Sequence, residues 1–122
     1  MVARRVFLAA GLYGLLATVP LYVLESALVR DRGTPITYPE YYYGFAGLAV
    51  AWQLAFLVIA RDPQRYRPLM PMGVLEKLGF GGAALVLWML GRTGGSTAAF
   101  GAIDLAWAAL FVLAFLKTPR AD

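Results

Sequence analysis

The chain has 122 residues, of which 61% are hydrophobic and 15% are charged, whereas soluble domains carry about 25% charged residues. It contains no cysteine and no histidine, which excludes disulfides, thiolate metal sites and imidazole acid–base chemistry. The net charge of +4 comes from basic residues spread over predicted loops and termini, so it indicates no nucleic-acid partner.

The first predicted membrane span covers residues 6–29. Its apolar stretch is longer than the roughly 7–15 residues of a signal peptide, so we expect it to be retained. Pro20 lies near its middle, where neighbouring helices in a membrane can satisfy the freed carbonyl, so we expect a kink rather than a break. Glu25 is expected about 6 Å below the outer end of this helix.

The second predicted span, residues 41–60, contains no charged side chain. At a rise of about 1.5 Å per residue it forms a helix of about 30 Å, which matches the hydrocarbon core of a bilayer. Thr37 and Glu40 flank Pro39 in a pattern typical of a capping box, so we expect Thr37 to cap this helix. Gln53 is expected near the membrane midplane.

The third predicted span covers residues 73–90. Three prolines between residues 61 and 72 are expected to keep that segment out of a helix. A helix that begins at residue 73 places Glu76 in its first turn, where a negative charge is favoured. It also lets the Lys77 side chain extend to the inner headgroups.

The fourth predicted span covers residues 98–116 and follows a glycine-rich turn at residues 91–97. It contains Asp104, which is expected about 10 Å below the outer end of its helix. The four spans together predict an all-α fold, an integral membrane four-helix bundle in a single domain.

Basic residues are unevenly distributed between the two sides of these spans. Three lie on one side, at Arg30, Arg32 and Arg92, and eight lie on or near the other, at Arg4, Arg5, Arg61, Arg65, Arg67, Lys77, Lys117 and Arg120. Because basic residues favour the cytoplasmic side, the sequence predicts that the N- and C-termini are both cytoplasmic.

Each predicted span carries a polar group that is costly to bury in hydrocarbon. These groups share helix faces with small residues, which let helices approach closely. The faces are Gly11, Gly14, Thr18, Tyr22 and Glu25; Tyr42, Ala46, Ala49 and Gln53; Glu76, Gly79 and Ala83; and Thr97, Gly101, Asp104 and Ala108. Two further ridges of small residues could pack within the chain or in a homodimer: Gly47, Ala51 and Ala55, and Ala98, Ala102 and Ala106.

Glu25 and Asp104 are predicted to turn toward each other in the outer half of the bundle. Two acids that converge in a low dielectric cannot both ionise cheaply, so one stays protonated or a cation joins them. One interpretation is a ligand-binding pocket formed by Glu25 and Asp104 and lined by Gln53, Tyr42, Trp107 and Tyr22. The alternative is that the two acids accept hydrogen bonds from tyrosine or tryptophan and only hold helices together.

The sequence therefore favours a small membrane protein that binds or carries an apolar or cationic small molecule, or a lipid, in an acidic pocket between helices. The alternative is a structural or assembly subunit that packs through its small-residue ridges. A proton-dependent membrane enzyme or exporter ranks third, because no nucleophile–base pair is visible. The sequence predicts no cofactor and no metal, and the expected partners are the lipid bilayer, a hydrophobic ligand and a second copy of the chain.

Residues 36–81 include PEYYYGF, an AWQ around Gln53, ARDPQRYRP and LEK. In these motifs the chain resembles a family of small bacterial four-span membrane proteins, which implies a multi-pass protein of the inner membrane but brings no established activity.

A GLY motif, Pro20, Glu25 and a QLAF motif that begins at Gln53 are similar to features of the emopamil-binding and sigma-2-receptor-like four-helix proteins. That similarity implies a sterol- or amine-sized pocket closed by acids, without the histidine that the isomerase members use. The chain is also similar to the DoxX-like four-span proteins.

Overall fold

The computed structural model describes residues 2–121, which form helices and turns and contain no strand. The helical elements are α1 (Val2–Thr18), the 3₁₀ helix η1 (Val19–Val23), α2 (Glu25–Arg32), α3 (Pro39–Arg61), the 3₁₀ helix η2 (Arg67–Leu69), α4 (Met70–Met89) and α5 (Gly95–Lys117). Within this part of the chain, four helical stretches are long and apolar enough to cross a membrane: Val2–Val23, Pro39–Arg61, Arg67–Met89 and Gly95–Lys117. The predicted all-α fold with four long apolar helices is confirmed.

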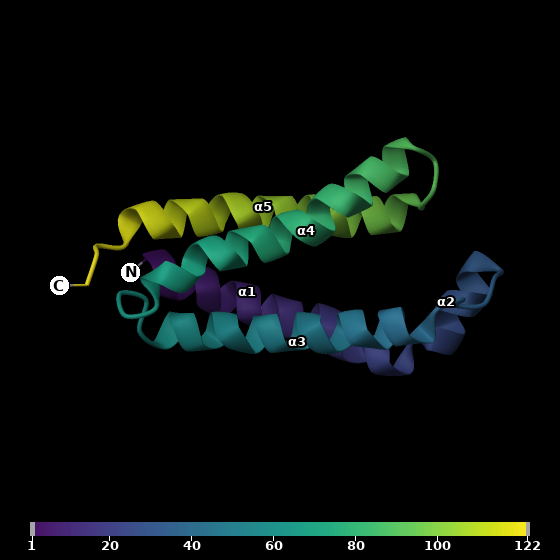
Figure 1. Ribbon diagram of the computed structural model, residues 1–122, viewed down its shortest axis with the longest axis horizontal. Helices are drawn as coiled ribbons and strands as arrows, with labels where there is room; N and C mark the ends of the chain where they lie inside the picture. Colours follow the sequence, from purple (N-terminus) through teal and green to yellow (C-terminus); the bar gives the residue numbers. More distant parts are fainter. Residues whose placement is uncertain (1, 122) are drawn as a thin grey trace.

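The helices form two hairpins, in which α1 packs along α3 and α4 packs along α5 (Figure 1). The N- and C-termini lie at one end of the molecule together with the α3–α4 connection, and we call this the terminal end. The opposite end, which carries α2 and the turn between α4 and α5, is the far end. The hairpins meet at the terminal end and diverge toward the far end, where α3 and α4 contact each other little.

An aromatic cluster at the terminal end joins the two hairpins. Phe7 of α1, Phe56 of α3 and Phe111 of α5 are all fully buried. The Phe7 and Phe111 rings stack with centroids 4.3 Å apart, and Phe56 meets Phe111 edge-on at 4.8 Å. Met70 of α4 is buried in the same cluster, so all four long helices contribute to this core. Aromatic pairs of this kind contribute about 0.5–1.5 kcal/mol beyond the burial of their area.

Small residues hold each hairpin together internally. In the α1–α3 hairpin, a Cβ added at Gly14 would lie 1.8 Å from the Gln53 side-chain oxygen. In the α4–α5 hairpin, a Cβ added at Gly101 would lie 2.7 Å from the Cβ of Ala84. A larger residue would therefore fit at neither position: Gly14 leaves room for the Gln53 side chain, and Gly101 lets α4 and α5 approach closely, as expected for small-residue faces.

The helix predicted as continuous over residues 6–29 is divided in the structure. The α-helix ends at Thr18, a 3₁₀ segment runs to Val23, and α2 begins at Glu25 as a separate helix. Pro20 lies within the 3₁₀ segment, where it has no N–H to continue the α-helical ladder and would clash with the preceding turn. The sequence predicts Glu25 near the outer end of the first helix, and this prediction is wrong because Glu25 begins a separate helix.

The other three long helices also begin earlier than predicted, and α5 begins at Gly95 rather than at residue 98. α4 begins at Met70, and η2 precedes it from Arg67, because Pro68 and Pro71 occupy first-turn positions, where a missing N–H costs nothing. At the start of α3, Tyr38 is the N-cap residue and makes no side-chain cap, so the expected Thr37 cap does not form. The earlier start of α4 moves Lys77 from the predicted edge of its span to the middle.

Candidate functional site

A buried polar cluster lies between the two hairpins, centred on Lys77 of α4. Lys77 is only 2% exposed. Its Nζ lies 3.5 Å from Gln53 Oε1 on α3, 3.7 Å from Glu76 Oε2 and 3.8 Å from Asp104 Oδ1 on α5. The expectation that Lys77 snorkels outward is therefore wrong: its ammonium turns into the bundle and pairs with carboxyl groups.

Gln53 is held in place by contacts on both sides of its amide. Its Nε2 donates a hydrogen bond to the carbonyl of Ala49 at 2.8 Å, which leaves Oε1 to face Lys77. The side chain fits because Gly14 of α1, opposite it, has no Cβ. A glycine on one helix thus makes room for a buried amide on the next, and that amide accepts a hydrogen bond from the lysine.

The ionic contacts of Lys77 are long and leave one oxygen of Glu76 without a hydrogen bond. Both N–O distances exceed the roughly 2.7–2.9 Å of a tight charge-assisted hydrogen bond. Among the described residues, Glu76 Oε2 is a buried oxygen without a hydrogen-bond partner. The ring of Phe56 adds an aromatic face 5.2 Å from the Lys77 ammonium. The cluster therefore contains one cation, two acids and one carboxyl oxygen with unused acceptor capacity.

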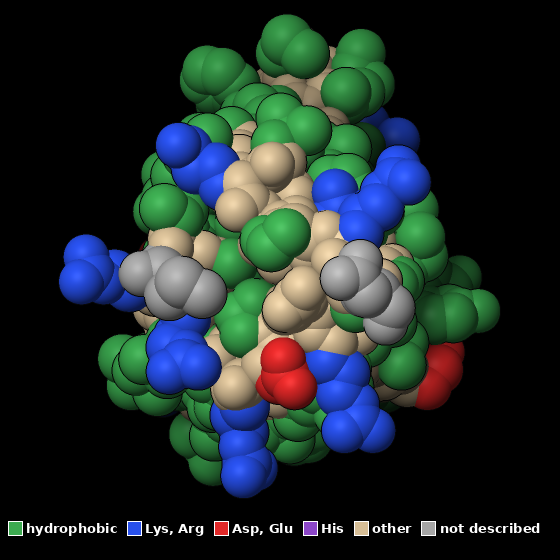
Figure 2. All heavy atoms as spheres, turned by 90° about the vertical axis from the view of Figure 1, so that its left-hand side faces the viewer, with side chains coloured by type: hydrophobic (Ala, Val, Ile, Leu, Met, Phe, Trp, Pro, Cys, Tyr) green, Lys and Arg blue, Asp and Glu red, His purple; other side chains and the backbone are tan. Residues whose placement is uncertain are grey.

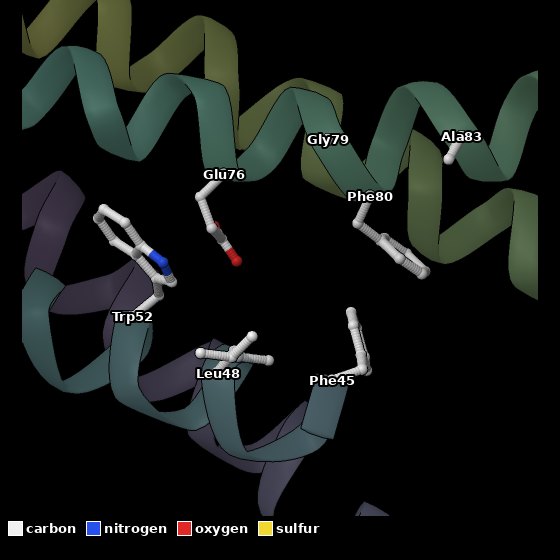
Figure 3. Close-up of a pocket in the computed structure, with 8 residues that line it drawn as sticks. Phe45, Leu48, Trp52, Glu76, Gly79, Phe80 and Ala83 are labelled. Atoms are coloured by element: carbon white, nitrogen blue, oxygen red, sulfur yellow. The ribbon is translucent and has the colours of Figure 1, made fainter. Parts of the chain in front are cut away.

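Glu76 also lines a cavity of about 400 Å³ between α3 and α4. The cavity is lined by Phe45, Leu48, Ala49 and Trp52 from α3 and by Glu76, Gly79, Phe80 and Ala83 from α4. Figure 3 shows the Glu76 carboxyl pointing from α4 toward α3, between Trp52 on one side and Phe45 and Phe80 on the other. The Phe45 and Phe80 rings lie 5.7 Å apart, so an aromatic pair joins the two helices beside the carboxyl.

Glu76, Gly79 and Ala83, which are predicted to share one face of α4, all line this cavity. The predicted tight packing of that face is wrong, because Gly79 and Ala83 are exposed and a Cβ added at Gly79 would meet nothing within 4 Å. Leu48 is 69% exposed, and Gly79 and Ala83 are also exposed, so the cavity opens onto the side of the bundle. A ligand could therefore reach Glu76 from the side, between α3 and α4, without passing through the closed terminal end.

A separate tyrosine cluster surrounds Glu25 toward the far end. The Tyr43 hydroxyl donates a hydrogen bond to Glu25 Oε1 at 2.7 Å, and the Tyr42 hydroxyl donates to the Leu21 carbonyl at 2.5 Å. The rings of Tyr22 and Tyr43 lie 6.1 Å apart. These contacts fasten α3 to η1 and to the start of α2, in the way that the structural interpretation of Glu25 describes.

The six residues predicted to line one pocket therefore fall into different groups. Glu25, Tyr22 and Tyr42 lie in the tyrosine cluster, and Gln53 and Asp104 lie in the Lys77 cluster. Trp107 packs on the rings of Tyr13 and Phe111 at 5.9 and 6.4 Å. No contact among the described residues joins Glu25 to Asp104, and each has another partner. Their pairing in one ligand pocket remains a prediction.

Glu76 and the aromatic residues around it are the part of this site that the sequence reasoning missed. The signal was present in Pro71, which is typical of the first turn of a helix as well as of a break. With α4 extended back to Met70, Glu76 and Lys77 fall close to the middle of the stretch Arg67–Met89, where two adjacent charges need partners.

Comparison with known proteins gives no further guide to function: no protein-family model, curated protein or solved structure matches this chain. The resemblances to four-span families therefore stay predictions. What the site can do is inferred from its own residues.

Proposed function

We propose that the chain is a multi-pass protein of the bacterial inner membrane that binds or carries an apolar organic cation in the cavity between α3 and α4. Both termini lie in the cytoplasm in this proposal. The ligand meets Glu76 in the middle of the bundle, with Gln53, Lys77 and Asp104 behind that carboxyl.

Membrane insertion is supported by the apolar surface of the long helices. Leu16, Leu48, Leu75 and Leu116 each leave more than half of their surface exposed, and they belong to four different long helices. A bilayer would cover such side chains at no cost, whereas soluble proteins rarely expose extended apolar surface.

The orientation is supported by the basic residues at the two ends of the bundle. Figure 2 shows lysine and arginine side chains around the terminal end. Seven basic residues belong to this end, at Arg4, Arg5, Arg61, Arg65, Arg67, Lys117 and Arg120, against Arg30, Arg32 and Arg92 at the far end. The buried Lys77 no longer counts toward either side, but the bias still favours a cytoplasmic terminal end.

The orientation is tested by labelling single cysteines, since the natural chain has none. In right-side-out vesicles, a membrane-impermeant maleimide should label Gly33→Cys and Gly94→Cys and should leave Ala121→Cys unlabelled until the vesicles are opened. Labelling of Ala121→Cys in intact vesicles would show the reverse orientation.

The ligand class rests on one observation: the Glu76 carboxyl group, whose buried Oε2 accepts no hydrogen bond, belongs to the lining of an aromatic cavity. A carboxylate attracts a cation, and the faces of Trp52, Phe45 and Phe80 attract the same charge through cation–π interactions. The other lining groups are apolar, so they favour a cation that carries hydrocarbon over a hydrated metal ion. The volume of about 400 Å³ is that of a small-molecule site.

Binding is tested with tetraphenylphosphonium, a permanent apolar cation, on purified protein in lipid nanodiscs by isothermal titration calorimetry. Triphenylphosphine oxide, which has a similar shape and no charge, is the matched neutral probe. Glu76→Gln should weaken binding of the cation about 10- to 100-fold, since an interaction with a charged partner contributes about 1.5–3 kcal/mol. Its effect on the neutral probe should be small.

Two control variants separate this site from other acids. Glu40→Gln removes an exposed carboxyl at the start of α3 and should leave binding unchanged. Glu25→Gln tests the pocket predicted around Glu25, and binding that depends on Glu25 but not on Glu76 would move the site to the tyrosine cluster. Equal affinity for the charged and neutral probes would contradict a cation site.

A structural or assembly role is the second candidate, and it is favoured by small residues on the bundle surface. Ala51, Ala102 and Ala106 are exposed, whereas Ala98 on the same ridge as Ala102 is buried. Exposed small residues permit a close contact with another membrane helix. Ala106→Leu should disrupt a dimer in analytical ultracentrifugation if this ridge is an interface, and it should leave cation binding unchanged if it is not.

A further inference from the structure

The charges of the Lys77 cluster do not balance. Lys77 supplies one positive charge, and Glu76 and Asp104 supply two negative charges when both are ionised. A cluster with a net charge of −1 in the middle of a membrane bundle is costly, because hydrocarbon solvates charge poorly. One added positive charge, either a proton or a bound cation, brings the cluster to neutrality.

The two carboxyl groups differ in access to that added charge. Glu76 lines the cavity, whereas Asp104 is absent from the cavity lining and reaches Lys77 from α5. Both carboxyl groups contact the Lys77 ammonium, at 3.7 and 3.8 Å, and Glu76 Oε2 accepts no hydrogen bond. Their side chains are similarly buried, at 16% and 15% exposure, so access to the cavity distinguishes them rather than burial alone. An arriving cation therefore meets Glu76 first.

Few other polar groups face this pair. From α3, the Gln53 amide contacts Lys77 and Trp52 lines the cavity beside Glu76. From α1, the phenol of Tyr13 lies within electrostatic range of Asp104, and α4 itself contributes Lys77. Neither Gln53 nor Trp52 carries charge, so the balance is set by Lys77, Glu76 and Asp104.

Building on the proposed function, we infer that the site exchanges its organic cation for one proton. The empty site holds a proton on Glu76, while Lys77 and Asp104 form a neutral pair. When the cation binds, the O–H bond of the Glu76 carboxyl breaks, the proton leaves to solvent and the carboxylate pairs with the cation. No electron is transferred, and the cluster is neutral before and after the exchange.

This charge count names the substrate class as monovalent organic cations. A divalent cation would leave the cluster positive after exchange, and a neutral analogue would displace no proton. Lys77 acts as a fixed internal cation, which lets a site with two acids take up only one external charge.

The experiment measures proton release when tetraphenylphosphonium binds the wild-type protein in nanodiscs. The probe has no proton of its own, so any proton released comes from the protein. Titration calorimetry in two buffers of different ionisation enthalpy should give one proton released per cation bound under acidic conditions. The affinity should rise with pH by up to about tenfold per unit and then level off, because protons and cations compete for one group.

Asp104→Asn provides the variant test. It leaves Lys77 and Glu76 as a neutral pair that needs no proton, so the cation should bind more weakly and release no proton. The double variant Lys77→Met/Asp104→Asn leaves Glu76 as the only charged group of the cluster and should restore release of one proton. Glu40→Gln is the matched control and should behave as the wild type.

The outcomes separate the exchange from the cation site itself. If the wild type binds the cation with no proton release and no pH dependence, exchange is wrong and the cation site stands. If it binds no tetraphenylphosphonium at any pH, the proposed function and the exchange are both wrong. If Asp104→Asn still releases one proton, the role assigned to the Lys77–Asp104 pair is overturned.

Discussion

At the terminal end, Phe7, Phe56 and Phe111 bring both hairpins into one aromatic core, whereas toward the far end the same hairpins separate and leave a cavity between α3 and α4. Small residues such as Gly14 and Gly101 act within each hairpin, and large buried aromatics act between hairpins. The comparison teaches that pairing of helices and docking of hairpins depend on different residues.

The polar cluster lies at the boundary between these two regions. Phe56 belongs to the aromatic core and its ring also faces the Lys77 ammonium at 5.2 Å, while Glu76 beside Lys77 lines the cavity. The aromatic core of the terminal end therefore contacts the Lys77 cluster on one side, and the cavity gives access to Glu76 on the other.

The largest expected loss of stability comes from removing a ring of the aromatic core at the terminal end. Phe111→Ala should lower the free energy of unfolding by about 3–5 kcal/mol, because it removes a fully buried ring and leaves a cavity. Phe45→Ala is the matched change in the cavity lining. The Phe45 ring is 44% exposed, so its removal should lower the free energy of unfolding by less than about 1.5 kcal/mol. Unfolding titrations in mixed detergent micelles measure both, and equal losses would remove the contrast between the two regions.

The second-largest loss of stability is expected from removing the Lys77 ammonium, which lies between the aromatic core and the cavity. Lys77→Met should cost about 3 kcal/mol at neutral pH, because it leaves the partly buried Asp104 carboxylate without a counter-charge. The loss should shrink as pH falls, because a carboxyl group that takes up a proton no longer needs a counter-charge.

The control for this variant is Lys117→Met, which removes an exposed lysine at the end of α5. It should change stability by less than about 0.5 kcal/mol at any pH. Unfolding titrations of both variants at pH 5 and pH 8 provide the test. A Lys77→Met loss that is the same at both values would count against carboxyl protonation as its cause.

A third, smaller loss of stability is expected from enlarging a glycine at the α1–α3 contact. Gly14→Ala should cost about 1–3 kcal/mol, because its Cβ would overlap the Gln53 amide and force α1 and α3 apart. Gly44→Ala is the matched control in α3, where an added Cβ meets nothing within 4 Å, and should be neutral or stabilising by up to about 1 kcal/mol. Thermal unfolding followed by tryptophan fluorescence compares the two, and the opposite ranking would contradict this packing.

The smallest effect concerns the far end, where Arg32 of α2 reaches across to the other hairpin. Its Nη2 donates a hydrogen bond to Thr97 Oγ1 at 3.0 Å. Because this contact is exposed, Arg32→Ala should change stability by less than about 1 kcal/mol. It should nevertheless broaden the distance distribution between spin labels at Gly33→Cys and Gly94→Cys, measured by pulsed electron resonance.

Arg30→Ala, which removes an exposed neighbour on the same helix, should leave that distribution unchanged. If Arg32→Ala also leaves it unchanged, the contact with Thr97 does not restrain the separation of the hairpins.

Much of the fold could be predicted from residue patterns along each helix. The four apolar stretches follow from length and hydropathy, and Gly14, Gln53 and Gly101 were expected on packed faces, where the structure buries them. Helix boundaries at proline were predicted less well. Pro71 was interpreted as a break although it begins a helix, and Pro20 ends an α-helix that was expected only to kink.

The candidate site could be predicted only in part. For Asp104 the sequence left open protonation, a cationic partner or hydrogen bonds from tyrosine or tryptophan. Lys77, which pairs with Asp104 in the structure, was predicted at the inner edge of the membrane. The wrong depth of Lys77 follows from the predicted start of α4, which is three residues too late. At a rise of about 1.5 Å per residue, this moves every side chain of the helix by about 4–5 Å.

The sequence by itself determined which segments become long apolar helices and which faces of them carry small or polar residues, because both depend on local composition and helical period. Only the tertiary structure decided that Lys77 joins Glu76, Asp104 and Gln53, and that Glu76 faces an aromatic cavity. Those contacts depend on which helices are neighbours and on how each is rotated and shifted along its axis. These quantities are set by packing among residues far apart in the chain.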